Sequence, residues 1–180
     1  MIEFEFNDVL LSVCRRYPWD ISFDDFIGDY NEDARYSIDG RRDFDYDWIW
    51  ESAEDDSQMS DILAESSDGY YVKRIRESDE LTIVLFDDEH NPCGFYTGVE
   101  SWVDLKHRGM DLSSMMISVS AILSHGSPNN GKAYGFSPSG VRAHEKAHEF
   151  LVNFAHENGF SILDENLVLY SLNRNSAYLK

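Results

Sequence analysis

Residues 108–114, Arg-Gly-Met-Asp-Leu-Ser-Ser, combine residue types that bind an anion at the start of a helix. The amides of a first helical turn have no partner within the helix, and the helix dipole makes that end positive. Arg108 adds a fixed cation, Gly109 lets the backbone turn tightly, and Ser113 and Ser114 are small hydrogen-bond donors. The segment therefore predicts a site that fits a pyrophosphate group. The simpler alternative is a turn between a strand and a helix that holds no ligand.

Residues 144–148, His-Glu-Lys-Ala-His, spell the HExxH pattern and resemble the zincin metalloproteases. His144 and His148 would share one face of a helix and could bind one Zn²⁺, with Glu145 as the base for a metal-bound water. The third ligand would be Glu165 or Asp164, beyond the helix. Against zinc, Lys146 places a cation between the two ligands, and a solvated helix face of alternating charges explains the same residues.

The elements that must position these motifs follow from hydrophobic periodicity. β-Branched and aromatic runs predict strands at 2–6, 70–75, 81–86, 93–98 and 100–105. Helical spacing of apolar residues predicts helices at 8–16, 111–123 and 139–158. Asn7 is expected to cap the first of these helices and Gly159 to end the last. Weaker signals predict a helical turn within 59–65 and short strands at 133–136, 160–163 and 166–172.

This order of elements predicts an α/β (α+β) fold with a mixed, mostly antiparallel central sheet flanked by helices. Residues 1–180 are expected to form a single domain, because no linker or internal repeat interrupts them. The segment of about 17–65 is both acidic and aromatic. We expect it to form short helices and loops that pack on the domain through their aromatic side chains.

Residues of about 70–172 resemble the GNAT superfamily of acetyltransferases by pattern. The hairpin at 81–98, the strand after it and the turn at 108–113 follow the order of that family. The late helix ending at Gly159 also matches the family, and the resemblance implies a GNAT-like sheet. Asp111 stands where the family motif has its first glycine, so a carboxylate would face the pyrophosphate unless it turns away as a helix cap. The tyrosine that often acts as the family's acid corresponds to Ala155.

The resemblance implies an acyl-CoA-dependent N-acyltransferase, which would move an acetyl group from acetyl-CoA to an amine of a protein or small molecule. The strand would pair with the pantetheine arm and the turn would hold the pyrophosphate. The residues implied in cofactor binding are Val103, Asp104, Leu105, Arg108, Gly109, Met110, Asp111, Leu112, Ser113 and Ser114. The catalytic candidates are Glu100 as a base or water relay, Tyr170 as a proton donor and His148 as a proton carrier, although each also fits an ordinary packing or surface role.

The charge balance restricts the partners of the chain. It has 34 acidic and 15 basic residues, a net charge of −19, and so opposes direct binding to nucleic acid, whose phosphates need Lys and Arg. A basic protein partner is compatible with this charge, which leaves a non-catalytic acidic binding or inhibitor protein as a further hypothesis. The two cysteines form no CxxC motif, and the chain shows neither a basic signal-peptide start nor a membrane-length apolar run. We therefore expect a cytoplasmic protein.

Overall fold

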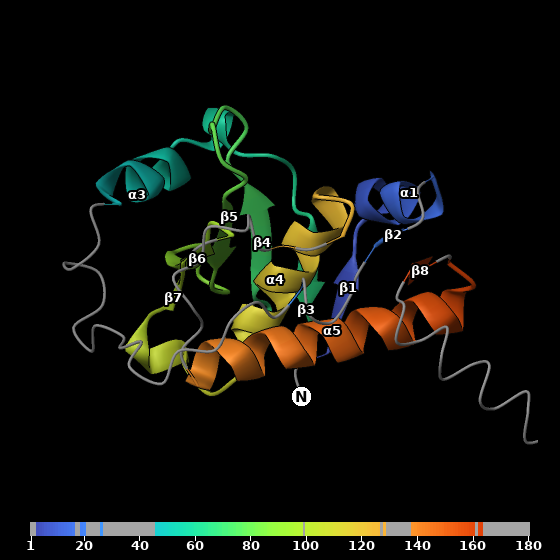
Figure 1. Ribbon diagram of the computed structural model, residues 1–180. Helices are drawn as coiled ribbons and strands as arrows, with labels where there is room; N and C mark the ends of the chain where they lie inside the picture. Colours follow the sequence, from blue (N-terminus) through green and yellow to red (C-terminus); the bar gives the residue numbers. More distant parts are fainter. Residues whose placement is uncertain are drawn as a thin grey trace, which may run out of the picture.

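A six-stranded antiparallel sheet forms the centre of the fold, in the order β1-β3-β4-β5-β6-β7 (Figure 1). The computed structural model describes residues 3–16, 19–20, 26, 46–98, 100–126, 128, 138–160 and 162–163. The strands of the sheet are β1 Phe4–Phe6, β3 Ala64–Ser66, β4 Tyr71–Arg74, β5 Ile83–Phe86, β6 Pro92–Tyr96 and β7 Ser101–Val103. With its flanking helices, this sheet confirms the predicted α+β class.

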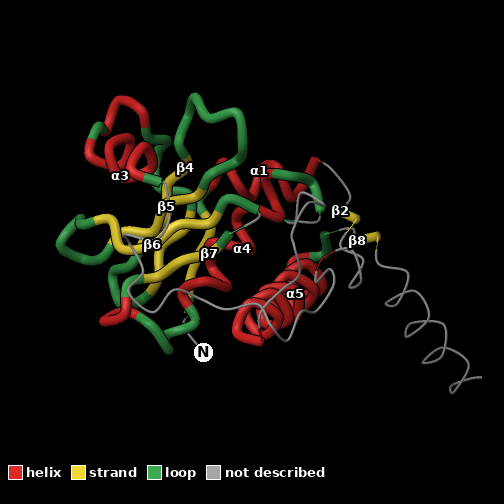
Figure 2. The backbone as a smooth tube through the Cα atoms, turned by 60° about the vertical axis from the view of Figure 1, so that its left-hand side comes forward, coloured by secondary structure: helices red, strands yellow, loops and turns green. Residues whose placement is uncertain are grey.

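Helices cover both faces of the sheet, because the strands alternate buried side chains between two apolar clusters. Ile83 and Leu85 of β5 belong to the cluster that includes residues of α1, α4 and α5, whereas Val84 and Phe86 belong to the cluster that includes α3. Figure 2 shows α3 on one side of the strands and the other three helices on the opposite side. These helices are α1 Asp8–Arg16, α3 Asp47–Glu54, α4 Leu112–Leu123 and α5 Pro138–Asn158.

The predicted helix boundaries agree with the structure to within a residue. Asn7 caps α1 as expected, since its side-chain oxygen accepts a hydrogen bond from the Leu10 amide at 2.9 Å. α5 ends before Gly159, whose φ of +69° is left-handed, and the Phe160 amide then donates to the Ala155 carbonyl at 2.8 Å. The strongly periodic segments were therefore sufficient to place the three main helices.

Two predictions for weaker segments are wrong or misplaced. Residues 59–65 do not form a helical turn: Met59 bridges Ile75, and the segment ends by entering β3. The burial of β3 alternates, and the strand pairs with β1 on one side and β4 on the other, so tertiary pairing decides its conformation. The strand predicted at 160–163 exists as β8, Ile162–Leu163, but it pairs with β2, Trp19–Asp20, in a separate two-stranded parallel sheet.

Several predicted segments lie wholly or partly outside the described residues. The predicted strands at 133–136 and 166–172 lie wholly outside them. Of the acidic aromatic segment of about 17–65, the structure describes 19–20, 26 and 46–65. The described part of that segment includes α3, which packs on the sheet as expected. No helix in the described part of the chain is both long and apolar enough to cross a membrane.

β7 forms one edge of the sheet and is held very close to β6. A Cβ on Gly94 would lie 2.8 Å from the Trp102 carbonyl oxygen, so this register requires a glycine. The Thr97 amide donates to the Glu100 carbonyl at 3.0 Å, and the Asp104 amide donates to the Cys93 carbonyl at 2.8 Å. Because hydrogen-bonded pairs alternate along an antiparallel ladder, the backbone groups of Ser101 and Val103 point away from β6 to the outer edge.

Candidate functional site

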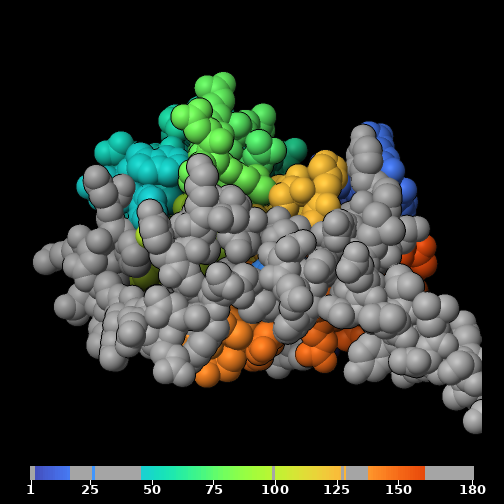
Figure 3. All heavy atoms as spheres, viewed as in Figure 1, coloured from blue at the N-terminus to red at the C-terminus, as the bar shows by residue number. Residues whose placement is uncertain are grey.

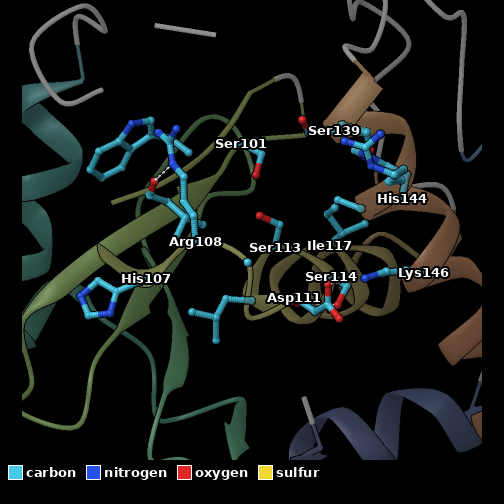
Figure 4. Close-up of a pocket in the computed structure, with 17 residues that line it drawn as sticks. Ser101, His107, Arg108, Asp111, Ser113, Ser114, Ile117, Ser139, His144 and Lys146 are labelled. Carbon is cyan, nitrogen blue, oxygen red and sulfur yellow. Dashed lines mark hydrogen bonds and ion pairs between the residues drawn. The ribbon is translucent and has the colours of Figure 1, made fainter. Parts of the chain in front are cut away.

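A pocket of about 340 Å³ lies between β7, the turn that follows it, the start of α4 and the first turns of α5 (Figure 4). Its volume falls in the range of small-molecule sites. Seven of the ten residues predicted to bind a cofactor line it: Val103, Arg108, Gly109, Asp111, Leu112, Ser113 and Ser114. The other three, Asp104, Leu105 and Met110, are not among the lining residues, and Leu105 is 55% exposed.

The charge of this pocket is opposite to that of the chain. Its lining includes the basic residues Arg108, Arg142 and Lys146, and Asp111 as its acidic residue. The chain as a whole has more than twice as many acidic as basic residues, 34 against 15. The fold therefore gathers cations from the β7–α4 turn and from α5 around one cavity, which favours an anionic ligand there.

Asp111 occupies the cap position of α4 without capping it. Its φ of +58° is left-handed, a conformation that Asp tolerates better than most residues. No side-chain capping hydrogen bond forms, and the carboxylate instead accepts a hydrogen bond from Lys146 of α5. The ion pair with Lys146, and not a capping hydrogen bond, therefore reduces the repulsion expected between Asp111 and a phosphate. Because the cap is missing, the first-turn amides of Leu112 and Ser113 remain available at the pocket wall.

Two of the side chains predicted to donate hydrogen bonds to a ligand already donate to backbone carbonyls of the protein. Arg108 Nε donates to the Val103 carbonyl at 2.7 Å, the bond drawn as a dashed line in Figure 4. This bond ties the turn to the end of β7 and leaves the remaining guanidinium donors for a ligand. The Ser114 hydroxyl donates to the Asp111 carbonyl at 2.6 Å, so it stabilises the start of α4.

A buried Tyr96–His144 pair joins β6 to α5 at the wall of the pocket. His144 Nδ1 lies 2.8 Å from the Gly140 carbonyl, which can only accept, so Nδ1 carries the ring proton. Nε2 therefore accepts from the Tyr96 hydroxyl at 2.9 Å. Burial lowers the pKa of His144 to about 4, and the ring is neutral at neutral pH. Sequence reasoning missed Tyr96, because its partner is 48 positions away.

His107 lines the pocket and was not singled out by sequence reasoning either. It is buried in the turn before α4, and its Nδ1 lies 2.8 Å from the Tyr70 hydroxyl. Its Nε2 lies 3.8 Å from Asp87 Oδ2, beyond hydrogen-bond distance. The contacts of His107 hold the turn against the start of β4 and the end of β5.

The geometry of the HExxH segment does not favour zinc. Both ring nitrogens of His144 already have partners, so a metal would have to displace Tyr96 or Gly140. His148 is half-buried on α5 and packs against Phe26, with ring centroids 5.4 Å apart. Glu165 and Asp164 lie outside the described residues. Within the described ranges, no three His, Cys, Asp or Glu side chains are grouped so as to hold a metal ion.

The predicted catalytic residues are not brought together at the pocket. Glu100 has the same strand parity as Trp102, so its side chain lies on the α3 face of β7, where it contacts Tyr46. His148 is not among the lining residues. Tyr170 lies outside the described part of the chain.

The Tyr96–His144 bond gives a stability prediction. Tyr96→Phe leaves His144 Nε2 buried without a donor, so we expect the free energy of unfolding to fall by about 1 to 2 kcal/mol in urea denaturation. Tyr71→Phe is the matched control, because its hydroxyl lies 3.0 Å from Nδ1 of the exposed His90. Water can replace that hydroxyl, so the loss should be smaller than for Tyr96. Equal losses would show that the buried pair has no special role.

Comparison of the chain with protein-family models, curated proteins and solved structures finds no match.

Proposed function

We propose that the chain is a cytoplasmic acyltransferase that takes an acyl group from acyl-CoA, with acetyl-CoA as the first candidate, and transfers it to an amine. The observation that carries the proposal is the reversal of charge at the pocket. Arg108, Arg142 and Lys146 surround the start of α4 in a strongly acidic chain. A ligand with several phosphate charges gains most from such a cavity.

The residues present fit the two chemically different parts of CoA. The open amides of Leu112 and Ser113, with the nearby basic side chains, would hold the phosphates at the positive end of α4. The outward backbone groups of Ser101 and the Val103 amide would pair with the pantetheine arm, as a strand edge pairs with an extended chain, while the Val103 carbonyl stays bonded to Arg108. Bound CoA supplies the activated thioester, and the pocket serves to orient it.

Binding is tested by calorimetry with CoA and acetyl-CoA, in wild-type protein and in Arg142→Gln. Arg142 is exposed on α5, so its replacement removes a pocket charge without opening the core. We expect affinity to fall about 5- to 10-fold, the effect of losing one charge-assisted contact at a partly solvated site. Arg16→Gln is the matched control, because Arg16 is exposed on α1 and does not line the pocket.

Comparing ligands separates phosphate recognition from recognition of the whole cofactor. Adenosine 3′,5′-bisphosphate should bind in competition with CoA, and pantetheine alone should bind far more weakly. Release of free thiol from acetyl-CoA in the presence of amine acceptors would then establish transfer. Absence of CoA binding, or binding that Arg142→Gln leaves unchanged, would remove the basis for the proposal.

A further inference from the structure

Two buried polar atoms on the α3 face of β7 have no hydrogen-bond partner. They are Glu100 Oε2 and Trp102 Nε1, and neither forms a hydrogen bond with any described residue. Glu100 and Trp102 are two positions apart at the same strand, so their side chains lie on the same face. Buried polar atoms without partners are few in native folds, and each needs an explanation such as a bound ligand.

No cationic side chain in the described part of the chain pairs with Glu100. The ion pairs that Lys and Arg form there are Lys73–Asp56 and Lys146–Asp111. Glu100 instead contacts the phenol of Tyr46. Burial, followed by the hydrogen bond and charge of Glu100 and the charge of Glu80, raises the pKa of Tyr46 well above its usual range. The charges of Glu100 and Glu80 therefore both act on Tyr46, and among the described residues no cationic side chain forms an ion pair with Glu100.

Aromatic rings pack together on the face of the sheet that carries this carboxylate. Trp50 meets Trp102 edge to face with ring centroids 5.5 Å apart, and meets Phe95 in the same way at 5.7 Å. Tyr46 packs on Phe95 at 5.0 Å. In the space-filling view, the cyan residues of α3 lie beside the green residues of the β4–β5 part of the sheet (Figure 3). Aromatic faces attract cations, and a carboxylate beside them adds a full negative charge.

We propose that Tyr46, Trp50, Phe95, Glu100 and Trp102 form a binding site for a small organic ammonium ion that carries at least one N–H. The ammonium would donate to Glu100 Oε2, and its carbon atoms would pack on the rings. Trp102 Nε1 would donate to a hydroxyl or carbonyl oxygen near the nitrogen. These requirements select amino alcohols and amino amides over quaternary ammonium ions. They also disfavour a metal ion, which needs several oxygen ligands.

Entry to this site needs only a local movement. Tyr46 and Glu100 are half-buried whereas Trp50, Phe95 and Trp102 are buried, so a ligand would enter beside Tyr46 and Glu100. Glu100 Oε2 is buried and has no donor, so the neighbouring Tyr46 side chain must move to admit the ammonium, which then shares the carboxylate with the phenol or replaces it. The proposal does not depend on acyl-CoA binding, because four of the five residues in this cluster do not line the pocket beside α4 and α5. The residue that the two sites share is Trp102.

The test uses ethanolamine as the probe and the indole N–H signals in ¹H–¹⁵N spectra as the readout, at constant ionic strength. We expect a saturable shift of the Trp102 indole signal, which Trp102→Phe identifies by its loss. Glu100→Gln should weaken binding about 10- to 100-fold, because it removes the charged acceptor. Glu51→Gln is the matched control on the exposed side of α3 and should change affinity less than about twofold, as a solvated charge does.

Two further measurements keep the proposal open to contradiction. Tyr46→Phe removes the donor that competes for Glu100, so it should tighten ethanolamine binding even if Glu100→Gln proves hard to fold. Tetramethylammonium, which lacks an N–H, should bind more weakly than ethanolamine. An unshifted Trp102 signal, wild-type affinity in Glu100→Gln, weaker binding in Tyr46→Phe or tighter binding of tetramethylammonium would each overturn the proposal.

Discussion

Acidification is expected to cost the fold about 3 kcal/mol through His144 alone. Burial lowers the pKa of this residue from 6.5 to about 4, so the folded state keeps the ring neutral while the unfolded chain protonates it. A group whose folded pKa is depressed in this way loses stability as the pH falls through the window between the two values. Each pKa unit corresponds to about 1.4 kcal/mol, and the loss is complete below about pH 4.

The measurement is urea unfolding of wild-type protein and His144→Gln at neutral pH and at about pH 4, where most of this loss has occurred. Protonation of the 34 acidic residues changes the self-repulsion of the chain, but both proteins share that effect. The stability difference between them should therefore shrink by about 3 kcal/mol on acidification. His148→Gln leaves the Tyr96–His144 pair intact, so the loss that comes from His144 should persist in that variant. A difference between wild type and His144→Gln that does not change with pH would contradict a neutral, buried His144.

Local pattern was enough to predict most of the elements, for a physical reason. Residues 111–123 and 139–158 place apolar side chains at helical spacing, and the same side chains fill the core from α4 and α5. β3 was missed because Ala64, Glu65 and Ser66 have no strong strand preference. Their conformation is set by β1 and β4 on either side, and a single segment does not reveal which neighbours it will have.

The candidate site likewise has a part that could be predicted from local sequence and a part that could not. The turn at 108–114 could be predicted, since an arginine, a glycine and small residues before a helix have a local chemical meaning. The contacts that α5 makes around this turn could not be predicted, because they join distant parts of the chain. Lys146 bonds to Asp111 across 35 positions, and His144 bonds to Tyr96 across 48. From the sequence, a zinc site at His144 was one alternative beside a solvated helix face; in the fold both ring nitrogens of His144 have protein partners at the pocket wall.

Replacing Asp111 with Asn is expected to tighten binding of CoA and of adenosine 3′,5′-bisphosphate about 30-fold. Asp111 carries the negative charge of the pocket lining and engages Lys146. A unit charge about 6 Å from a phosphate, in the partly solvated environment of a pocket, costs about 2 kcal/mol of binding free energy. Asn keeps the shape of the side chain and also tolerates the left-handed backbone at this position. The change therefore removes the charge and releases Lys146 without remodelling the turn.

Calorimetry at two ionic strengths checks whether the tighter binding of Asp111→Asn is electrostatic, because the gain in affinity should diminish as salt screens the pocket. Glu145→Gln is the matched control, since Glu145 is exposed on α5 beside Lys146 and does not line the pocket. Lys146→Gln should weaken binding more in the Asp111→Asn background than in wild type, because Lys146 is shared with Asp111 only in wild type. If Asp111→Asn instead weakened binding, the carboxylate would itself be a ligand contact, and the pocket would favour a cationic or sugar-hydroxyl group at the start of α4.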